Sequence, residues 1–178
     1  MKSGWYRSLL FAAFLLQTGC STTPTTKDYS VLDPSLERES IYIVPFDATL
    51  VPPDFSDPIF NEFVDTLNAR RKQTKVGRFV ILKEELKEVE PAWLIKQVYI
   101  SGDIWGYAEK SGCCSTDMKV KSRIYLYEPG RNTPTFEVSA PVEYYFDHDR
   151  DDVTDAKARL GKKMALDLAE AVIKKLTP

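Results

Sequence analysis

The segment Val98–Tyr107, VYISGDIWGY, decides the fold of this 178-residue chain. Its side chains alternate in character with a period of two, which is the period of a β-strand. One face carries small and aliphatic residues: Ile100, Gly102, Ile104 and Gly106. The other face carries polar and aromatic residues: Tyr99, Ser101, Asp103, Trp105 and Tyr107. The segment therefore predicts a strand that buries one face and presents aromatic side chains on the other.

The alternation continues downstream and predicts two further strands. In Met118–Tyr127 the apolar positions alternate with Lys119, Lys121, Arg123, Tyr125 and Tyr127. The segment Phe136–Phe146 places apolar residues on one face in the same way, and the turn-forming residues of Glu128–Pro134 separate the two strands. Pro141 cannot donate a ladder hydrogen bond, so the last strand is expected to lie at an edge or to carry a bulge there.

Upstream, the pattern changes to a βαβ unit. Ile41–Phe46 is apolar almost throughout, which is typical of a central strand covered on both faces. Asp57 is expected to cap a helix that runs from Pro58 to Leu67 with one apolar face. A second strand is predicted at Phe79–Leu82, and a short, charged helical turn at Glu84–Glu90.

A long amphipathic helix, Val153–Leu176, closes the chain. Apolar residues recur in it at a spacing of four: Leu160, Met164, Leu168 and Val172. The predicted order is β-α-β-(α)-β-β-β-α. This order indicates an α+β fold with an α/β start, in which a mixed, mostly antiparallel sheet packs its helices on one face. Residues 39–178 are expected to form a single globular domain.

The N-terminus has the pattern of an export signal. Lys2 and Arg7 precede the apolar run Leu9–Leu16. A helix of that length spans about 12 Å, which is too short for a bilayer core of about 30 Å but suits the apolar region of a signal peptide. Residues 1–19 are therefore predicted to be a signal peptide.

The next residues, Gln17-Thr18-Gly19-Cys20, resemble the lipobox of bacterial lipoproteins. The resemblance implies that Cys20 becomes the first mature residue and carries a diacylglyceryl chain. Gln17 departs from the motif, which usually has Leu there, and an ordinary secretory signal with an incidental Cys20 is the alternative. Residues 20–38 begin with a small, polar, Pro-containing run and are predicted to be a flexible tether. Ser21, where retained inner-membrane lipoproteins carry Asp, implies the periplasmic face of the outer membrane.

The domain also resembles a superfamily of periplasmic lipoproteins. The resemblance rests on the element order and on the strands IYIVPF (41–46), RFVIL (78–82) and YISGDI (99–104). The superfamily contains the curli-secretion lipoprotein, the penicillin-binding-protein activator lipoproteins and TolB-N-like domains. It implies an accessory protein that binds a peptidoglycan synthase or a secretion or transport apparatus. Nothing in the chain supplies the extra strands of the curli channel.

Charge and motifs exclude several classes of function. The full chain has a net charge of −2, and loss of Lys2 and Arg7 with the signal would make it −4. A mildly acidic chain with interspersed charges lacks the basic surface with which proteins bind nucleic acid. The sequence has no Gly-rich phosphate loop, HExxH or GxSxG motif, so neither an enzyme nor a cofactor is expected. The single histidine, His148, is predicted to lie in an acidic loop that caps the last helix.

Two adjacent cysteines, Cys113 and Cys114, need a separate explanation. Neighbouring Cα atoms lie about 3.8 Å apart, below the usual 4.4–6.8 Å for a disulfide, so a bridge between them would be strained. An oxidising periplasm would permit that bridge, and reduced thiols, intermolecular bridges and soft-metal ligation are the alternatives. No metal site is predicted, because His148 is remote in sequence from both cysteines.

The aromatic face of the predicted sheet is the candidate partner-binding site. Its members are Tyr99, Trp105, Tyr107, Arg123, Tyr125 and Tyr127. Two interpretations stay open: ordinary cross-strand pairs on a half-exposed sheet, or a docking surface, since Tyr, Trp and Arg dominate binding hot spots. The leading hypothesis is a non-catalytic adaptor, anchored in the membrane by lipid, that binds an envelope protein. The alternatives are a lipid or small-ligand carrier and an enzyme acting through Cys113 and Cys114. The oligomeric state cannot be predicted.

Overall fold

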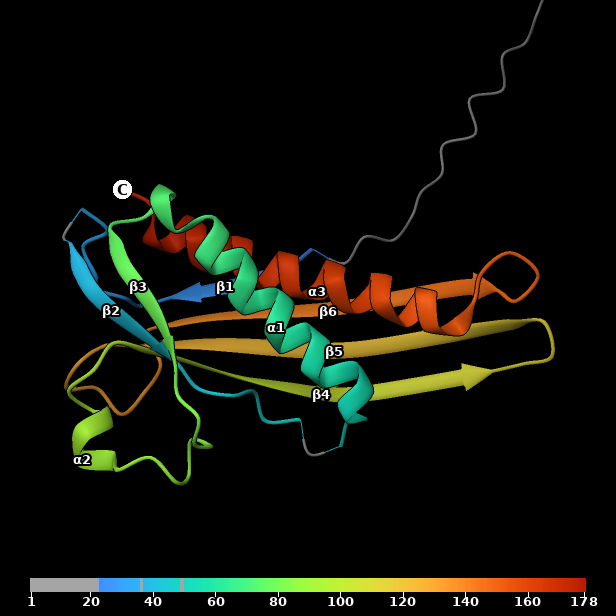
Figure 1. Cartoon of the computed structure of the whole chain (residues 1–178), viewed down its shortest axis with the longest axis horizontal. Coiled ribbons are helices and arrows are strands. Elements are labelled where there is room, and N and C mark those ends of the chain that lie inside the picture. The colour runs from blue at the N-terminus through green and yellow to red at the C-terminus, as the bar shows by residue number, and fades with distance from the viewer. Residues whose placement is uncertain (1–22, 36, 49) are drawn as a thin grey trace, which may run out of the picture.

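The computed structural model describes residues 23–35, 37–48 and 50–178, which form one mixed sheet with its two long helices on the same side (Figure 1). Six strands lie in the order β1-β6-β5-β4-β2-β3. Their bounds are Thr25–Asp28 (β1), Arg38–Ile43 (β2), Val76–Ile81 (β3), Tyr99–Ser111 (β4), Ser115–Tyr127 (β5) and Phe136–Asp147 (β6). The helices are Pro53–Ala69 (α1), Pro91–Leu94 (α2) and Val153–Leu176 (α3), with a 3-10 turn at Arg71–Gln73 (η1).

The predicted fold class is confirmed. β2 pairs in parallel with β3 and with β4, whereas β4, β5, β6 and β1 pair antiparallel. Helices α1 and α3 pack against each other and cover one face of the sheet (Figure 1). Fully buried side chains fill the space between the two layers, among them Ile124 and Leu126 from the sheet and Met164 and Leu168 from α3. In the described part of the chain, no helix has the length and apolarity that crossing a membrane requires.

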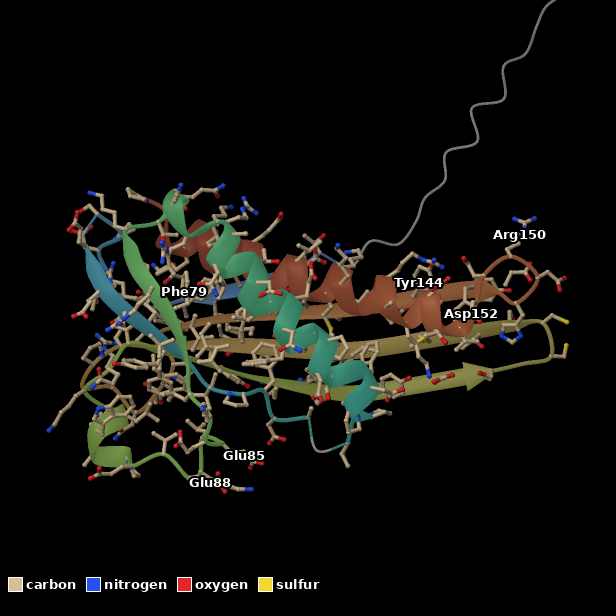
Figure 2. The ribbon with its side chains drawn as sticks, viewed as in Figure 1. Phe79, Glu85, Glu88, Tyr144, Arg150 and Asp152 are labelled. Atoms are coloured by element: carbon tan, nitrogen blue, oxygen red, sulfur yellow. The ribbon has the colours of Figure 1, made fainter. Side chains whose placement is uncertain are left out.

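Two predicted helices are displaced in the structure. α1 begins at Pro53 rather than after Asp57, because Pro52 and Pro53 occupy the N-cap and first helical positions and Phe55 extends the buried face. The segment Glu84–Glu90 forms turns instead of a helix. Its carboxylates, Glu85 and Glu88 among them, project away from the body of the protein (Figure 2). The short helix, α2, instead starts at Pro91, because Trp93 and Leu94 within it pack against apolar side chains.

The flexible tether predicted for residues 20–38 is wrong for part of its length. Thr25–Asp28 is a strand that pairs with residues 136–139 of β6. All four of its residues are exposed, and no alternation of apolar side chains marked it in the sequence. Its backbone pairing is supplemented by two ion pairs, Lys27–Glu137 at 3.4 Å and Asp28–Lys175 at 2.9 Å. Tyr29 extends the pairing by donating its backbone N–H to the Thr135 carbonyl at 2.6 Å. Cys20 and the predicted signal peptide, residues 1–19, lie outside the described residues.

A buried carboxylate holds the chain that follows β1. Glu128 is 3% exposed, and its Oε1 accepts three hydrogen bonds. The donors are the Ser30 hydroxyl at 2.5 Å, the Val31 N–H at 2.9 Å and the Leu32 N–H at 2.8 Å. Its other oxygen, Oε2, lies 3.7 Å from the Arg131 guanidinium. Residues 30–32 are therefore fastened to the start of the β5–β6 loop.

Candidate partner-binding face

The sheet surface opposite α1 and α3 is called the open face here, and β1, β6, β5 and β4 contribute to it (Figure 1). Its residues follow from the register of the ladders. One row across the sheet is Trp105, Lys121 and Pro141, and the next is Asp103, Arg123, Ser139 and Thr25. Tyr145 lies further along β6, with 68% of its surface exposed. The face is thus a mixture of aromatic and charged side chains on rigid strands.

Five residues in the middle of the open face form what we call the central cluster: Asp103, Trp105, Lys121, Arg123 and Tyr125. The Arg123 guanidinium lies 5.2 Å from the centre of the Trp105 ring and 5.8 Å from that of Tyr125. The Lys121 amine lies 5.0 Å from the Trp105 ring. These distances are typical of cation–π contacts. Trp105 is nevertheless 40% exposed, so much of its indole is available to a partner.

The cluster also contains a partly buried acid. The Tyr125 hydroxyl donates to Asp103 Oδ2 at 3.0 Å, and Asp103 Oδ1 has no hydrogen-bond partner among the described residues. Burial raises the pKa of the Asp103 carboxyl, and the hydrogen bond from Tyr125 and the charge of Arg123 oppose the rise. The Arg123 Nε is likewise buried without a hydrogen-bond partner in the part of the chain that the structure describes. The cluster therefore contains one buried acceptor and one buried donor that have no hydrogen bond from the described residues.

Tyr99 and Tyr127 lie at one end of the open face but are covered. Their rings stack at 4.4 Å, and Tyr99 is only 8% exposed. Val44 and Leu94 complete a small second core with Tyr99, and Trp93 packs edge-on against Tyr42 at 4.9 Å. The segment that contains α2 thus removes this pair of tyrosines from the accessible part of the face.

Tyr107 does not lie on the open face, contrary to the sequence prediction. The ladder between β4 and β5 shifts register between Trp105 and Ala108, which is a β-bulge. Gly106 permits the bulge because its φ is +67°, a left-handed conformation that disfavours other residues. The extra residue turns Tyr107 to the helix side, where its ring lies 5.2 Å from that of Phe55. Its hydroxyl donates to Glu109, which pairs with Lys157 of α3 at 2.9 Å.

The buried tyrosines predict a late alkaline titration. Burial raises the pKa of Tyr99 to about 12, and burial together with the hydrogen bond to Asp103 raises that of Tyr125 to about 12. Since unfolded tyrosine titrates near 10, their stabilising contribution is complete below pH 10 and is lost as the pH rises to about 12. Tyrosinate absorbance should show a late phase that Tyr99→Phe and Tyr125→Phe each reduce. An unchanged late phase in both variants would contradict this assignment.

The two adjacent cysteines lie at the tip of the β4–β5 hairpin. Cys113 and Cys114 are exposed thiols whose sulfur atoms are 3.0 Å apart. The hydrogen bond with Cys113 is the main cause of a raised pKa at Cys114. The tip touches the next loop, where the His148 N–H donates to the Cys114 carbonyl at 2.9 Å. A disulfide between the pair remains a prediction, as do its alternatives. Among the described residues, no three Cys, His, Asp or Glu side chains are arranged to hold a metal.

The acidic loop around His148 caps the last helix, as the sequence predicts. Asp152 at the start of α3 accepts hydrogen bonds from the Thr154 N–H at 2.7 Å and the Asp155 N–H at 3.3 Å (Figure 2). These bonds lower the pKa of Asp152. His148 itself shares a hydrogen bond between Nε2 and the Thr116 hydroxyl at 2.8 Å. The loop thus has a structural role at the helix N-terminus.

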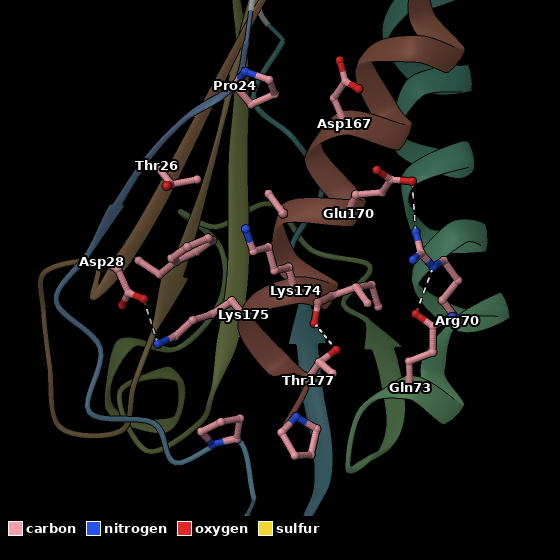
Figure 3. Close-up of a pocket in the computed structure, with 15 residues that line it drawn as sticks. Pro24, Thr26, Asp28, Arg70, Gln73, Asp167, Glu170, Lys174, Lys175 and Thr177 are labelled. Atoms are coloured by element: carbon pink, nitrogen blue, oxygen red, sulfur yellow. Dashed lines mark hydrogen bonds and ion pairs between the residues drawn. The ribbon is translucent and has the colours of Figure 1, made fainter.

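A groove of about 1010 Å³ lies at the other end of the molecule (Figure 3). It runs between β1, the second half of α3 and the corner where α1 meets η1. Two ion pairs flank it: Asp28–Lys175 at 2.9 Å and Arg70–Glu170 at 3.1 Å. The sequence did not indicate this groove, because one of its walls is β1, which was not predicted.

Comparisons with known proteins identify the fold. No protein-family model and no curated protein sequence matches the chain. Among solved structures, PelC from Paraburkholderia phytofirmans, described as a dodecamer, matches with a TM-score of 0.53 and 15% identity over 83% of this chain and 96% of that one. A homolog of a putative neuraminyllactose-binding hemagglutinin from Helicobacter pylori matches with a TM-score of 0.50 and 8% identity, over 84% and 89%. Lipoprotein GNA1162 from Neisseria meningitidis matches with a TM-score of 0.45 and 9% identity, over 78% and 97%. The likeness concerns the fold alone.

Proposed function

We propose that this protein is a non-catalytic accessory lipoprotein of the bacterial cell envelope. A lipid on Cys20 holds it at the periplasmic face of the outer membrane, and the open face docks another envelope protein. The observation that carries the proposal is the central cluster, in which Trp105, Arg123 and Tyr125 stand on a sheet face that α1 and α3 leave uncovered.

The size of the open face suits a protein partner. Its four strands are about 4.8 Å apart, and the exposed part runs for about ten residues at about 3.4 Å each, which gives roughly 600 Å². A standard interface buries about 800 Å² on each partner. The side chains that project from the sheet and the neighbouring loops would supply the remaining area. The face is therefore large enough for a specific, non-obligate complex.

The chemistry of the cluster supports the same conclusion. Trp, Tyr and Arg dominate the residues that carry binding energy, especially near the centre of an interface. Here the contacts to Trp105 and Tyr125 already hold Arg123 in place, so binding would cost little side-chain entropy. The flanking pair Lys119–Glu143, at 3.3 Å, would form part of a polar rim.

The interior argues against the alternative of a lipid or small-ligand carrier. A carrier needs an apolar cavity between sheet and helices, and in this protein fully buried residues such as Met118, Ile124, Leu160 and Leu168 occupy that layer. The groove beside β1 is wide but is flanked by ion pairs rather than by a continuous apolar lining. The adaptor hypothesis therefore accounts for more of the structure.

Truncation of the cluster tests the proposal. We expect Trp105→Ala with Arg123→Ala to reduce the recovery of the partner at least tenfold when the tagged protein is extracted from membranes in mild detergent. The matched control is Leu50→Ala with Arg150→Ala, which removes an exposed apolar residue and an exposed arginine elsewhere. Because PelC is described as a dodecamer, the native mass is measured in parallel so that a second copy is recognised as partner. Identical recovery from the wild type, the double variant and the control would refute docking at this face.

A further inference from the structure

The positive charge of this chain is distributed unevenly. Residues 66–83 contain no Asp or Glu but six cations, although the whole chain is acidic. Four of the six fall within residues 70–75, where α1 ends and η1 follows. The last turn of α3 brings Lys174 and Lys175 to the same end of the molecule (Figure 3). One end of an acidic protein is thus locally basic.

Three of these cations have no anionic partner among the described residues: Arg71, Lys72 and Lys174. We call them the basic corner. All three are exposed. Their neighbours are neutralised, since Arg70 pairs with Glu170 at 3.1 Å and Lys175 with Asp28 at 2.9 Å. The remaining acid of the groove, Asp167, pairs with Lys163 at 2.7 Å, and Lys75 faces the charge of Asp33.

A single groove extends from the basic corner to the point from which the chain leads to Cys20. Pro24 and Thr26 line the same groove as Arg70, Gln73 and Lys174 (Figure 3). Cys20 precedes Pro24 by four residues, and four residues span at most about 14 Å. A lipid on Cys20 would therefore hold this end of the domain close to the membrane surface. The Debye length is about 8–10 Å at physiological salt, so charges at that range still act.

We propose that the basic corner lies against the anionic phospholipid headgroups of the leaflet in which the protein is anchored. This inference rests on the proposed lipid anchor. Each cation near an anionic surface contributes about 1 kcal/mol, which corresponds to roughly a fivefold change in partition. The contact would add a second, weak membrane attachment to the lipid and would restrict how the domain tilts about its short tether.

The form of the corner favours a lipid surface over a protein partner. Its cations are exposed and extend from a helix end and a 3-10 turn, and no residue of that turn is buried. The two lysine ammonium groups act as hydrated point charges, and the Arg71 guanidinium has the donor geometry that suits phosphate oxygens, so neither kind of group needs shape complementarity with a folded partner. The layer of phospholipid headgroups provides a negative electrostatic potential that attracts such cations. Specific protein interfaces instead depend on packed central residues of the kind found on the open face.

A vesicle assay separates this contact from the lipid anchor. The chain from residue 20 with Cys20→Ser contains every residue of the described fold and carries no acyl group. We expect it to co-sediment with phosphatidylcholine vesicles that contain phosphatidylglycerol, and not with pure phosphatidylcholine. Arg71→Ala, Lys72→Ala and Lys174→Ala together should lower the partition coefficient at least tenfold. Raised salt should have a similar effect.

The matched control removes three exposed cations that lie outside the basic corner and have no anionic partner in the part of the chain that the structure describes: Lys83→Ala, Lys96→Ala and Lys110→Ala. It should retain most of the binding. Equal loss in both triple variants would show that only net charge matters and would overturn the proposal, as would equal binding to neutral vesicles or no binding to anionic ones. The intact mass of the protein extracted from cells tests the anchor separately. If the protein from cells is acylated but its unlipidated form does not bind anionic vesicles, the proposed lipid anchor stands and the proposed headgroup contact is wrong.

Discussion

Glu128→Ala is expected to lower the free energy of unfolding by about 2–3 kcal/mol and to release the N-terminal segment from the domain. The carboxylate is 3% exposed and accepts three hydrogen bonds from residues 30–32, one of them from a hydroxyl. Alanine removes every acceptor and leaves a cavity. Hydrogen exchange should report the release, because the amides of β1 and of residues 30–32 would exchange faster than those of β4 and β5.

Two variants sharpen this test. Glu128→Gln keeps one acceptor oxygen and should lose less stability than Glu128→Ala. Glu143→Ala removes an exposed carboxylate that pairs with Lys119 at 3.3 Å, and should cost less than about 1 kcal/mol. Protection of β1 that is equal in Glu128→Ala and in the wild type would show that strand pairing alone holds the segment.

Gly102→Val is expected to destabilise the domain by about 2–3 kcal/mol through overpacking. A Cβ at this position would lie 2.9 Å from the Phe46 ring and 3.0 Å from the Arg123 carbonyl oxygen. Phe46 cannot move freely, because it packs edge-on against Phe60 at 5.1 Å and also contacts Phe63 at 5.3 Å. Chemical denaturation with the far-ultraviolet signal as readout measures the loss.

Gly112→Ala is the matched control for Gly102→Val. Its Cβ would meet only the Ser115 carbonyl at 3.5 Å, an ordinary contact, so its stability should change by less than about 0.5 kcal/mol. If Gly102→Val were as stable as this control, Phe46 would have to lie elsewhere in solution. The close approach of the chain after β2 to β4 would then be wrong.

The periodic elements could be predicted because burial imposes a period on the sequence. Strands β5 and β6 alternate, and α3 repeats apolar residues every four positions, so the type of each element and its buried face follow directly. β1 could not be predicted, since all four of its side chains are exposed and no apolar alternation marks the strand, although its backbone pairs with β6. A sequence pattern therefore reveals the elements that the core requires and misses a strand that backbone pairing and surface ion pairs hold.

The candidate site was predicted in part for similar reasons. Trp105, Arg123 and Tyr125 share a face because the alternation of β4 and β5 is regular up to Trp105. Tyr107 turned out to lie on the other face, and the signal was present in Gly106, since a glycine within a strand often marks a bulge. The burial of Tyr99 and the partial burial of Tyr127 depend on Trp93 and Leu94, which lie in a short helix whose sequence shows no period of its own.

The proposed membrane contact and the proposed docking site lie on different parts of the surface. The segment that would lead to the lipid is fastened by β1 pairing and by Glu128. The groove, the basic corner and the start of this segment lie together, whereas the central cluster belongs to the sheet surface that faces away from α1 and α3. Attachment to the membrane and docking of a partner would therefore use separate surfaces, and variants of one should leave the other unchanged.

In-cell photocrosslinking from the open face tests the central claim most directly. A photoreactive residue is placed at Lys121 or at Tyr145 on the open face, and at Lys162 on the exposed side of α3 as control. The proposed function predicts that both open-face positions capture the same envelope protein, or a second copy of this chain, and that Lys162 does not. Capture of the same abundant envelope proteins from all three positions, or of none, would contradict docking through the open face.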